Sequence, residues 1–209
     1  MNLLLRLNLA LGVVFGVGAL ASGLVCLSVL NANAQREALE QAALMIDSAL
    51  SIRDYTEREI VPLLHTQMQS QFLPQSVPFY AATQNFLRLH ETRPLYEYKE
   101  ATLNPTNPRD RATDWEADLI ERFRNDARAH QLSGERDTPM GRSLYLARPI
   151  HAEASCMVCH SLAAAAPTSV IARYGSANGF GWQVGEVIGA QVVSVPVAMV
   201  EANAHAALH

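Results

Sequence analysis

The sequence predicts an α+β domain behind a single transmembrane helix, in a chain of 209 residues. Three observations support this prediction. The first is an almost unbroken apolar run near the N-terminus, long enough to cross a bilayer as a helix. The second is a stretch with helical spacing of apolar residues directly after it, and the third is a set of short apolar strands further along the chain. Helices flanking a small antiparallel sheet follow from this order.

Composition and charge narrow the function classes. Apolar residues make up 49% of the chain, so it can bury a real core in one domain with an appended segment. The formal net charge of -4 is mild and the Lys and Arg residues are scattered, which makes nucleic acid a poor candidate partner. The three cysteines are too few for a disulfide-stapled scaffold.

The N-terminal segment determines the expected compartment. Residues 7–30 are almost continuously apolar and Arg6 flanks them, so we expect one transmembrane anchor within residues 1–34 and the remainder outside the cytoplasm. The alternative is a cleaved signal peptide, because residues 32–34 have the small-x-small pattern of a cleavage site. The run exceeds the ~7 to 15 apolar residues of a typical signal peptide, which favours a retained anchor. The expected location is a bacterial inner membrane, crossed once, with the domain in the periplasm.

The segment after the anchor, residues 33–71, predicts a long amphipathic helix that Pro62 is expected to kink or end. Stretches rich in proline, glycine or asparagine separate the later elements. Those elements are a connector at 72–78, a helix at 79–90, a strand at 96–101, a loop at 103–108, a helix at 114–128 with Asp114 as N-cap, a turn at 134–141, strands at 143–150 and 187–195, and a short helical tail at 197–209.

The motif that carries chemistry is Cys156-Met157-Val158-Cys159-His160, a C-x-x-C-H sequence. Two thiols at this spacing can form thioethers to the two vinyl groups of one haem, while the adjacent imidazole ligates the iron. The thioethers hold the cofactor covalently, so it cannot be lost outside the cell. The motif therefore predicts one covalent haem c, bound through Cys156 and Cys159, with His160 as the proximal iron ligand.

Three other interpretations of the motif stay open. A redox dithiol is one, although no βαβ pattern surrounds the motif as it does in thioredoxin-like proteins. A structural zinc site is another, and it would need His151 to join the motif's cysteines and histidine within ten residues, which is cramped. An ordinary structural disulfide is the third. Export together with the adjacent histidine favours haem attachment.

Several short motifs resemble a known family in their order and spacing. They are residues 98–108, 115–116 and 147–150, the C-x-x-C-H motif, and residues 174–175, 179–182, 189–190 and 195–196. The chain resembles the exported c-type haem domains with a PAS-like fold, which serve as sensor inputs of membrane receptors or as stand-alone monohaem cytochromes. The resemblance implies a PAS-like or Cache-like α+β domain at residues 35–196, with a central antiparallel sheet and a long N-terminal helix.

The resemblance also bears on the other cofactor contacts. A family member has a cysteine as second axial ligand, but here no cysteine besides the motif pair lies outside the apolar run, so Met45 or His65 is the expected sixth ligand. Charged or aromatic residues are further candidates for contact with the propionates or for the apolar wall of the pocket. They are Arg53, Tyr55, Arg148, Tyr174 and Trp182.

Two functions follow from these expectations. The first is one-electron transfer by a membrane-anchored monohaem cytochrome, either alone or as a subunit of a membrane complex. The alternative is a haem-based redox or gas sensor that acts through a separate partner. Either function implies a membrane-protein redox or signalling partner. No catalytic constellation stands out, so the chain is not expected to be an enzyme.

Overall fold

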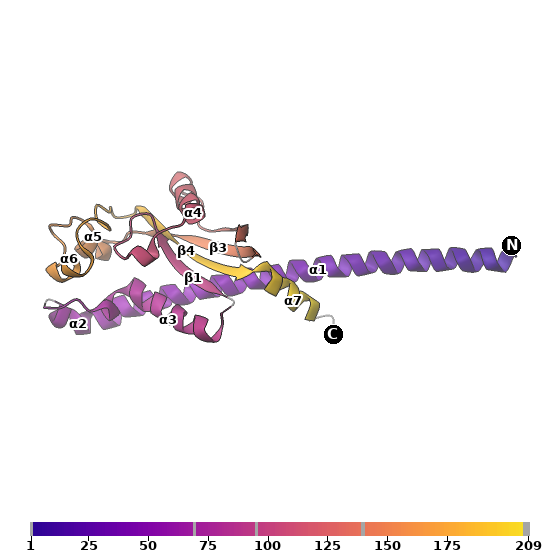
Figure 1. The fold of residues 1–209 in the computed structure, drawn as a ribbon, viewed down its shortest axis with the longest axis horizontal. Coiled ribbons are helices and arrows are strands. Elements are labelled where there is room, and N and C mark those ends of the chain that lie inside the picture. The colour runs from indigo at the N-terminus through magenta and orange to yellow at the C-terminus, as the bar shows by residue number, and fades with distance from the viewer. Residues whose placement is uncertain (1, 69, 95, 139–140, 207–209) are drawn as a thin grey trace.

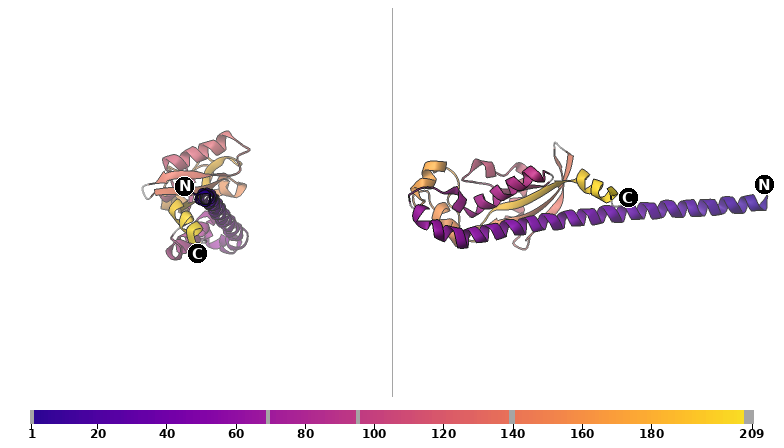
Figure 2. Two further views of the ribbon diagram at one scale, coloured as in Figure 1. Left: turned by 90° about the vertical axis from the view of Figure 1, so that its right-hand side faces the viewer. Right: turned by 90° about the horizontal axis from the view of Figure 1, so that it is seen from below.

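The computed structural model describes residues 2–68, 70–94, 96–138 and 141–206. Helix α1 (Leu3–Tyr55) runs without interruption into a short π-helix, η1 (Thr56–Ile60), and then into α2 (Val61–Met68). Together they form one helical rod that projects far beyond the folded head (Figures 1 and 2). The expectation that Pro62 ends the helix is wrong. The π-helical turn directly before it changes the backbone hydrogen-bonding pattern where Pro62 lacks an N–H, and the helix continues.

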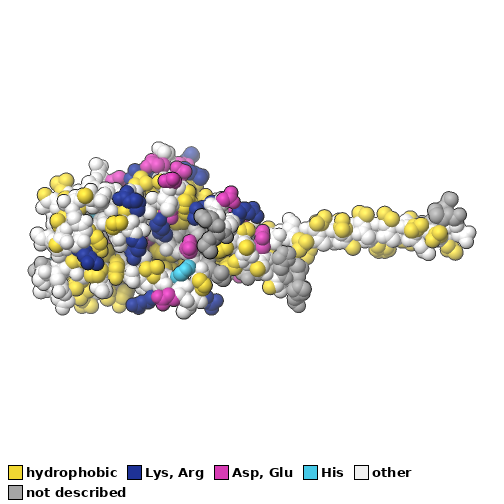
Figure 3. Space-filling model, viewed as in Figure 1, with side chains coloured by type: hydrophobic (Ala, Val, Ile, Leu, Met, Phe, Trp, Pro, Cys, Tyr) yellow, Lys and Arg dark blue, Asp and Glu magenta, His cyan; other side chains and the backbone are white. Residues whose placement is uncertain are grey.

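The projecting part of α1 is the only described helix that is long and apolar enough to cross a membrane. Its most apolar window has a mean hydropathy of 2.3, and none of that window is buried against the head. Charged side chains gather on the head, whereas the projecting helix shows mainly apolar ones (Figure 3). This agrees with a membrane anchor and equally with a signal sequence.

The head contains a four-stranded antiparallel sheet in the order β1-β4-β3-β2. Its strands are β1 (Glu97–Thr102), β2 (Leu132–Thr138), β3 (Gly141–His151) and β4 (Val187–Pro196). The first strand therefore pairs with the last, which brings the two ends of the head's sequence together. The expected α+β class, with a central antiparallel sheet and a long N-terminal helix, is confirmed.

Helices cover both faces of the sheet (Figure 1). On one face, α1 buries Ala42 and Ile46 against Val193 of β4, and α3 (Pro78–Thr92) packs beside it. On the other face, α4 (Asp114–Asn125) buries Ile120 against Val192. Successive residues of β4 thus point to opposite faces, as the alternation of a strand requires. Helix α7 (Val197–Ala206) follows β4 and packs against α1 near the projecting end.

Two local expectations are corrected. The stretch expected to be a turn is largely strand β2, and only its end reaches the residues outside the described ranges. The strand escaped notice because its inward positions are not all apolar: the Arg136 guanidinium lies over the Trp115 ring at 3.8 Å from the ring centroid. Helix α4 is capped by Thr113 rather than Asp114, through a capping box with Glu116, and it ends at Asn125.

Candidate cofactor site

The C-x-x-C-H motif lies at the end of the head farthest from the projecting helix (Figure 1). The chain leaves β3 and forms a 3-10 turn, η4 (Ala154–Cys156), then the short helix α5 (Met157–His160). Helix α6 (Thr168–Tyr174) follows. Both motif thiols are half-buried, and burial raises the pKa of Cys159. One helical turn thus carries both sulfurs and the adjacent imidazole.

The imidazole of His160 has a defined orientation and tautomer. Its Nδ1 lies 2.6 Å from the backbone carbonyl oxygen of Gly179. A carbonyl can only accept, so Nδ1 carries the proton and Nε2 keeps a free lone pair. Burial lowers the pKa of His160, although the hydrogen bond to Gly179 opposes this shift. The ring is therefore held neutral with Nε2 available as a metal ligand, and the Nδ1–H bond is the outer contact typical of ligating histidines.

The loop from Gly175 to Gly185 folds back over α5. The Trp182 ring stacks on the His160 ring, with 4.0 Å between centroids and 12° between planes. The backbone N–H of Trp182 donates to the His160 carbonyl at 3.2 Å, and the N–H of Gly181 donates to the Ser161 carbonyl at 2.8 Å. The stacking holds the face of the His160 ring, and the two hydrogen bonds hold the backbone of His160 and Ser161.

Thr106 closes the other side of the histidine. Its hydroxyl lies 3.4 Å from His160 Nδ1. Gly179 is pressed against Thr106 so closely that a Cβ at position 179 would overlap the threonine hydroxyl, and its φ of +82° also favours glycine. The carbonyl that accepts the hydrogen bond from His160 is thus positioned by a residue more than seventy positions away in sequence.

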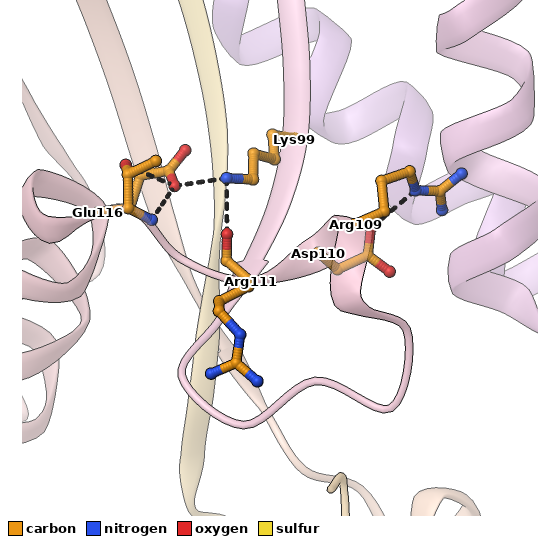
Figure 4. Close-up of polar contacts among 6 residues, drawn as sticks. Lys99, Arg109, Asp110, Arg111 and Glu116 are labelled. Atoms are coloured by element: carbon orange, nitrogen blue, oxygen red, sulfur yellow. Dashed lines mark hydrogen bonds and ion pairs between the residues drawn. The ribbon is translucent and has the colours of Figure 1, made fainter. Parts of the chain in front are cut away.

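The loop that carries Thr106 is anchored by a polar cluster (Figure 4). Lys99 Nζ of β1 donates to a Glu116 carboxylate oxygen at 2.6 Å and to the Arg111 carbonyl at 2.9 Å. The same Glu116 oxygen accepts from the backbone N–H and the hydroxyl of Thr113, at 2.7 and 2.8 Å. The buried Glu116 therefore ties strand, loop and helix α4 together.

An apolar wall borders the motif. Ile150, Ala152 and Ile188 are buried together at the end of the sheet. Phe79, Met157 and Trp182 are partly buried against them. Trp182, expected to line a cofactor pocket, is thus part of this wall. Tyr174 instead makes an edge-on contact with Phe72, with ring centroids 5.5 Å apart.

Arg53 reaches the wall from α1. Its guanidinium carbon lies 3.7 Å from the centroid of the Phe79 ring. The Nε atom is buried and has no hydrogen-bond partner. Buried guanidinium donors normally have one, so this atom marks a place where an acceptor is missing.

The other expected contact residues lie elsewhere. Arg148 pairs with Asp47 of α1 at 2.5 Å and with Gln131 at 3.0 Å. Tyr55 points outward with 59% of its surface exposed, and His65 on α2 is exposed. Met45 is partly buried in the core between α1, α3 and the sheet. None of these four side chains is among the described groups that contact the His160 ring, which are Gly179, Thr106 and Trp182.

The alternative zinc site gains no support. Among the described residues, no three His, Cys, Asp or Glu side chains gather in a way that could hold a metal ion. His151, which that site would need, is exposed and pairs through Nδ1 with the Gly185 carbonyl at 3.2 Å. Sequence reasoning missed the contacts of Thr106 and Phe79. Thr106 lies within the motif at residues 98–108 and Phe79 lies in none of the motifs, and the fold alone brings the two side chains to His160 and Arg53 respectively.

The fold and the site together define an α+β domain that follows one long apolar helix and holds the His160 ring by a hydrogen bond and by stacking. The Tll0287-like family model matches residues 31–196, so the chain belongs to the Tll0287-like family. Among solved structures, the crystal structure of the cyanobacterial heme-protein Tll0287 is similar, with a TM-score of 0.59 and 18% sequence identity. The match covers 77% of this chain and 95% of that one. No curated protein matches the chain significantly.

Proposed function

We propose that this chain is a membrane-anchored, exported monohaem c-type cytochrome with a PAS-like domain, and that it performs one-electron transfer. The observation that carries the proposal is the His160 ring, which donates from Nδ1 to Gly179 and keeps Nε2 free, one residue after a thiol pair at haem-attachment spacing. The cyanobacterial heme-protein with the same fold supports it. No catalytic activity is part of the proposal.

The residues present fit a covalent haem. Cys156 and Cys159 would hold it, His160 would ligate its iron, and Trp182 and Phe79 would supply apolar contact. The unpartnered Nε of Arg53 offers a donor for a carboxylate such as a propionate. When bound, such a group supplies a one-electron couple. The chain's own part is to hold the imidazole neutral and oriented and to limit solvent access.

The position of the site suggests the kind of partner. About 22 helical residues separate the end of the apolar run, near residue 30, from Arg53, a rise of roughly 35 Å at about 1.5 Å per residue. An electron partner embedded in the bilayer would therefore be remote from the site. We propose that the partner is an exported redox protein, or the periplasmic portion of a membrane protein.

A sensor is the second candidate, and one observation favours it. The rod that would cross the membrane continues unbroken into the head, and a π-helical turn occurs three residues after Arg53. Such turns often mark functional sites in helices. A change at the cofactor site could shift this turn and reach a membrane partner along α1.

Haem staining and optical spectra test the proposal. The wild-type chain is produced in an exporting host with a cytochrome c maturation system, extracted with detergent, and run on a denaturing gel stained for haem. We expect the stain in the wild type and in a Cys26→Ser control, and its loss in a Cys156→Ser, Cys159→Ser double variant. A wild-type band without stain contradicts the proposal.

Carbon monoxide separates the two candidate functions. A reduced spectrum that carbon monoxide leaves unchanged indicates two firm axial ligands and supports electron transfer. A spectrum that shifts readily supports gas sensing. Met45→Leu and His65→Gln variants, measured in the same way, test the two predicted sixth ligands: the ligand's loss is expected to open the iron to carbon monoxide.

A further inference from the structure

A buried carboxyl group lies between α1 and the sheet, outside the site described above. Glu100 of β1 is only 4% exposed. Its carboxylate accepts a hydrogen bond from the Tyr98 hydroxyl at 2.6 Å, and Gln191 of β4 donates to that hydroxyl at 3.0 Å. Glu100 and Gln191 are direct register partners, and Gln191 is 2% exposed. The three side chains form a closed polar network in the core.

Within the described part of the chain, the carboxyl group in this network, that of Glu100, is not paired with a cationic side chain. Among the residues that the structure describes, Glu100 forms no ion pair, and the nearby Arg53 guanidinium lies on the Phe79 ring. The charged and titratable groups facing Glu100 are Arg53 from α1, Asp110 from the turn after the Thr106 loop, and Tyr98 from its own strand. Burying an unpaired carboxylate is costly, so the protonated form is favoured.

The balance of these groups makes Glu100 titratable near neutrality. Burial raises the pKa of Glu100 to about 7, with a smaller contribution from Asp110, while Arg53 and the hydrogen bonds from Tyr98 and Gln191 oppose the rise. Burial also raises the pKa of Tyr98 well above its ordinary value, so the phenol stays protonated and donates. Glu100 is thus the member of the network that exchanges a proton.

We propose that Glu100 is a proton-binding site whose occupancy follows the oxidation state of the haem held by Cys156, Cys159 and His160. The proposal rests on the function proposed above. When a one-electron donor delivers an electron to the site, the Glu100 carboxylate takes up one proton from water, and the net charge of the head stays the same. Oxidation by a one-electron acceptor releases that proton.

Arg53 provides the physical connection between Glu100 and the candidate cofactor site. Its guanidinium acts on Glu100 electrostatically and contacts Phe79, which belongs to the apolar wall beside Trp182. A negative charge added in this poorly solvated region raises the affinity of a nearby carboxylate for a proton. By linkage, a proton on Glu100 then favours the reduced form.

The test is a potentiometric titration of the haem-loaded, detergent-solubilised protein at a series of pH values. We expect the midpoint potential of the wild type to fall as pH rises through about 7. In Glu100→Gln it stays flat over that range. Glu97→Gln, an exposed carboxyl on the same strand, serves as the matched control and keeps the wild-type profile.

A second readout reports the proton directly. In the reduced-minus-oxidised infrared spectrum, a protonated carboxyl band is expected in the wild type and in Glu97→Gln, and is expected to vanish in Glu100→Gln. An Arg53→Gln variant is expected to move the pH-dependent step of the potential to higher pH, because the opposing positive charge is gone.

The outcomes separate this proposal from the proposed function. A haem-loaded wild type with a flat profile, or a Glu100→Gln variant with the wild-type profile, overturns the proton site and leaves the cytochrome intact. A preparation without covalent haem overturns both.

Discussion

His160 Nδ1 donates a hydrogen bond to the backbone carbonyl of Gly179 at 2.6 Å. This contact joins the short motif helix to a loop nineteen residues later, and it determines which ring nitrogen is free. The carbonyl can occupy this position because Gly179 has a φ of +82° and no Cβ to collide with Thr106. The orientation of the His160 ring therefore depends on a glycine outside the C-x-x-C-H motif.

Replacing Gly179 tests this dependence. Gly179→Ala adds both backbone strain and overlap with Thr106, whose backbone N would lie 2.9 Å from the new Cβ. We expect a loss of about 2–4 kcal/mol in the free energy of unfolding, measured by chemical denaturation. Gly185→Ala is the matched control, because Gly185 has a φ of +84° and nothing within 4 Å of the new Cβ. A loss as large in the control would show that overlap with Thr106 is unimportant.

Removing Glu116 should loosen the Thr106 loop. Its carboxylate accepts from Lys99 and from Thr113, and the side chain is buried. Glu116→Ala deletes the capping box and leaves the Lys99 ammonium with the Arg111 carbonyl but without its carboxylate partner, so we expect a loss of about 2–3 kcal/mol in the free energy of unfolding, measured by thermal or chemical denaturation. Glu121→Ala, an exposed carboxyl on the same helix, is expected to change stability by less than about 0.5 kcal/mol. Equal effects would argue against the anchoring role.

Stability should depend on pH through Glu100. Its folded pKa of about 7 is raised above its ordinary value of 4.5, so the folded state binds this proton more tightly than the unfolded state does. The stabilising contribution is complete below about pH 4.5 and is lost as pH rises toward and through 7. Glu100→Gln should therefore gain stability relative to the wild type as pH rises, by at most on the order of 3 kcal/mol above pH 7. Unfolding midpoints at several pH values measure this difference, and a constant difference would contradict the prediction.

The N-terminal segment is expected to remain in the mature protein. Residues 32–34, which form the small-x-small pattern, lie within continuous helix α1, and Ala34 packs against an apolar cluster that includes Leu144 and Val195. Intact mass spectrometry of membrane-extracted protein should give the full chain plus one haem. A mass lacking the first 34 residues would show that the segment is a cleaved signal peptide.

The sequence by itself determined the features that depend on neighbours along the chain. Apolar runs and helical spacing gave the projecting helix and α3, because those patterns reflect local periodicity. The thiol pair and His160 could be recognised because they lie within five consecutive residues. The same local reasoning failed at β2, whose inward Arg136 is accommodated by Trp115 from α4, and at Pro62, whose missing donor is accommodated by the preceding π-helical turn.

Only the tertiary structure decided which partners those residues have. The contacts of His160 with Gly179 and Thr106, and of Arg53 with Phe79, join segments that are distant in sequence. Arg148, a candidate for the cofactor site, instead pairs with Asp47 because β3 lies beneath α1. Glu100 acquired its unusual proton affinity in the same way. An exposed and a buried carboxyl look alike in a sequence, and the free energy of burial arises only when α1 and the sheet close over the side chain.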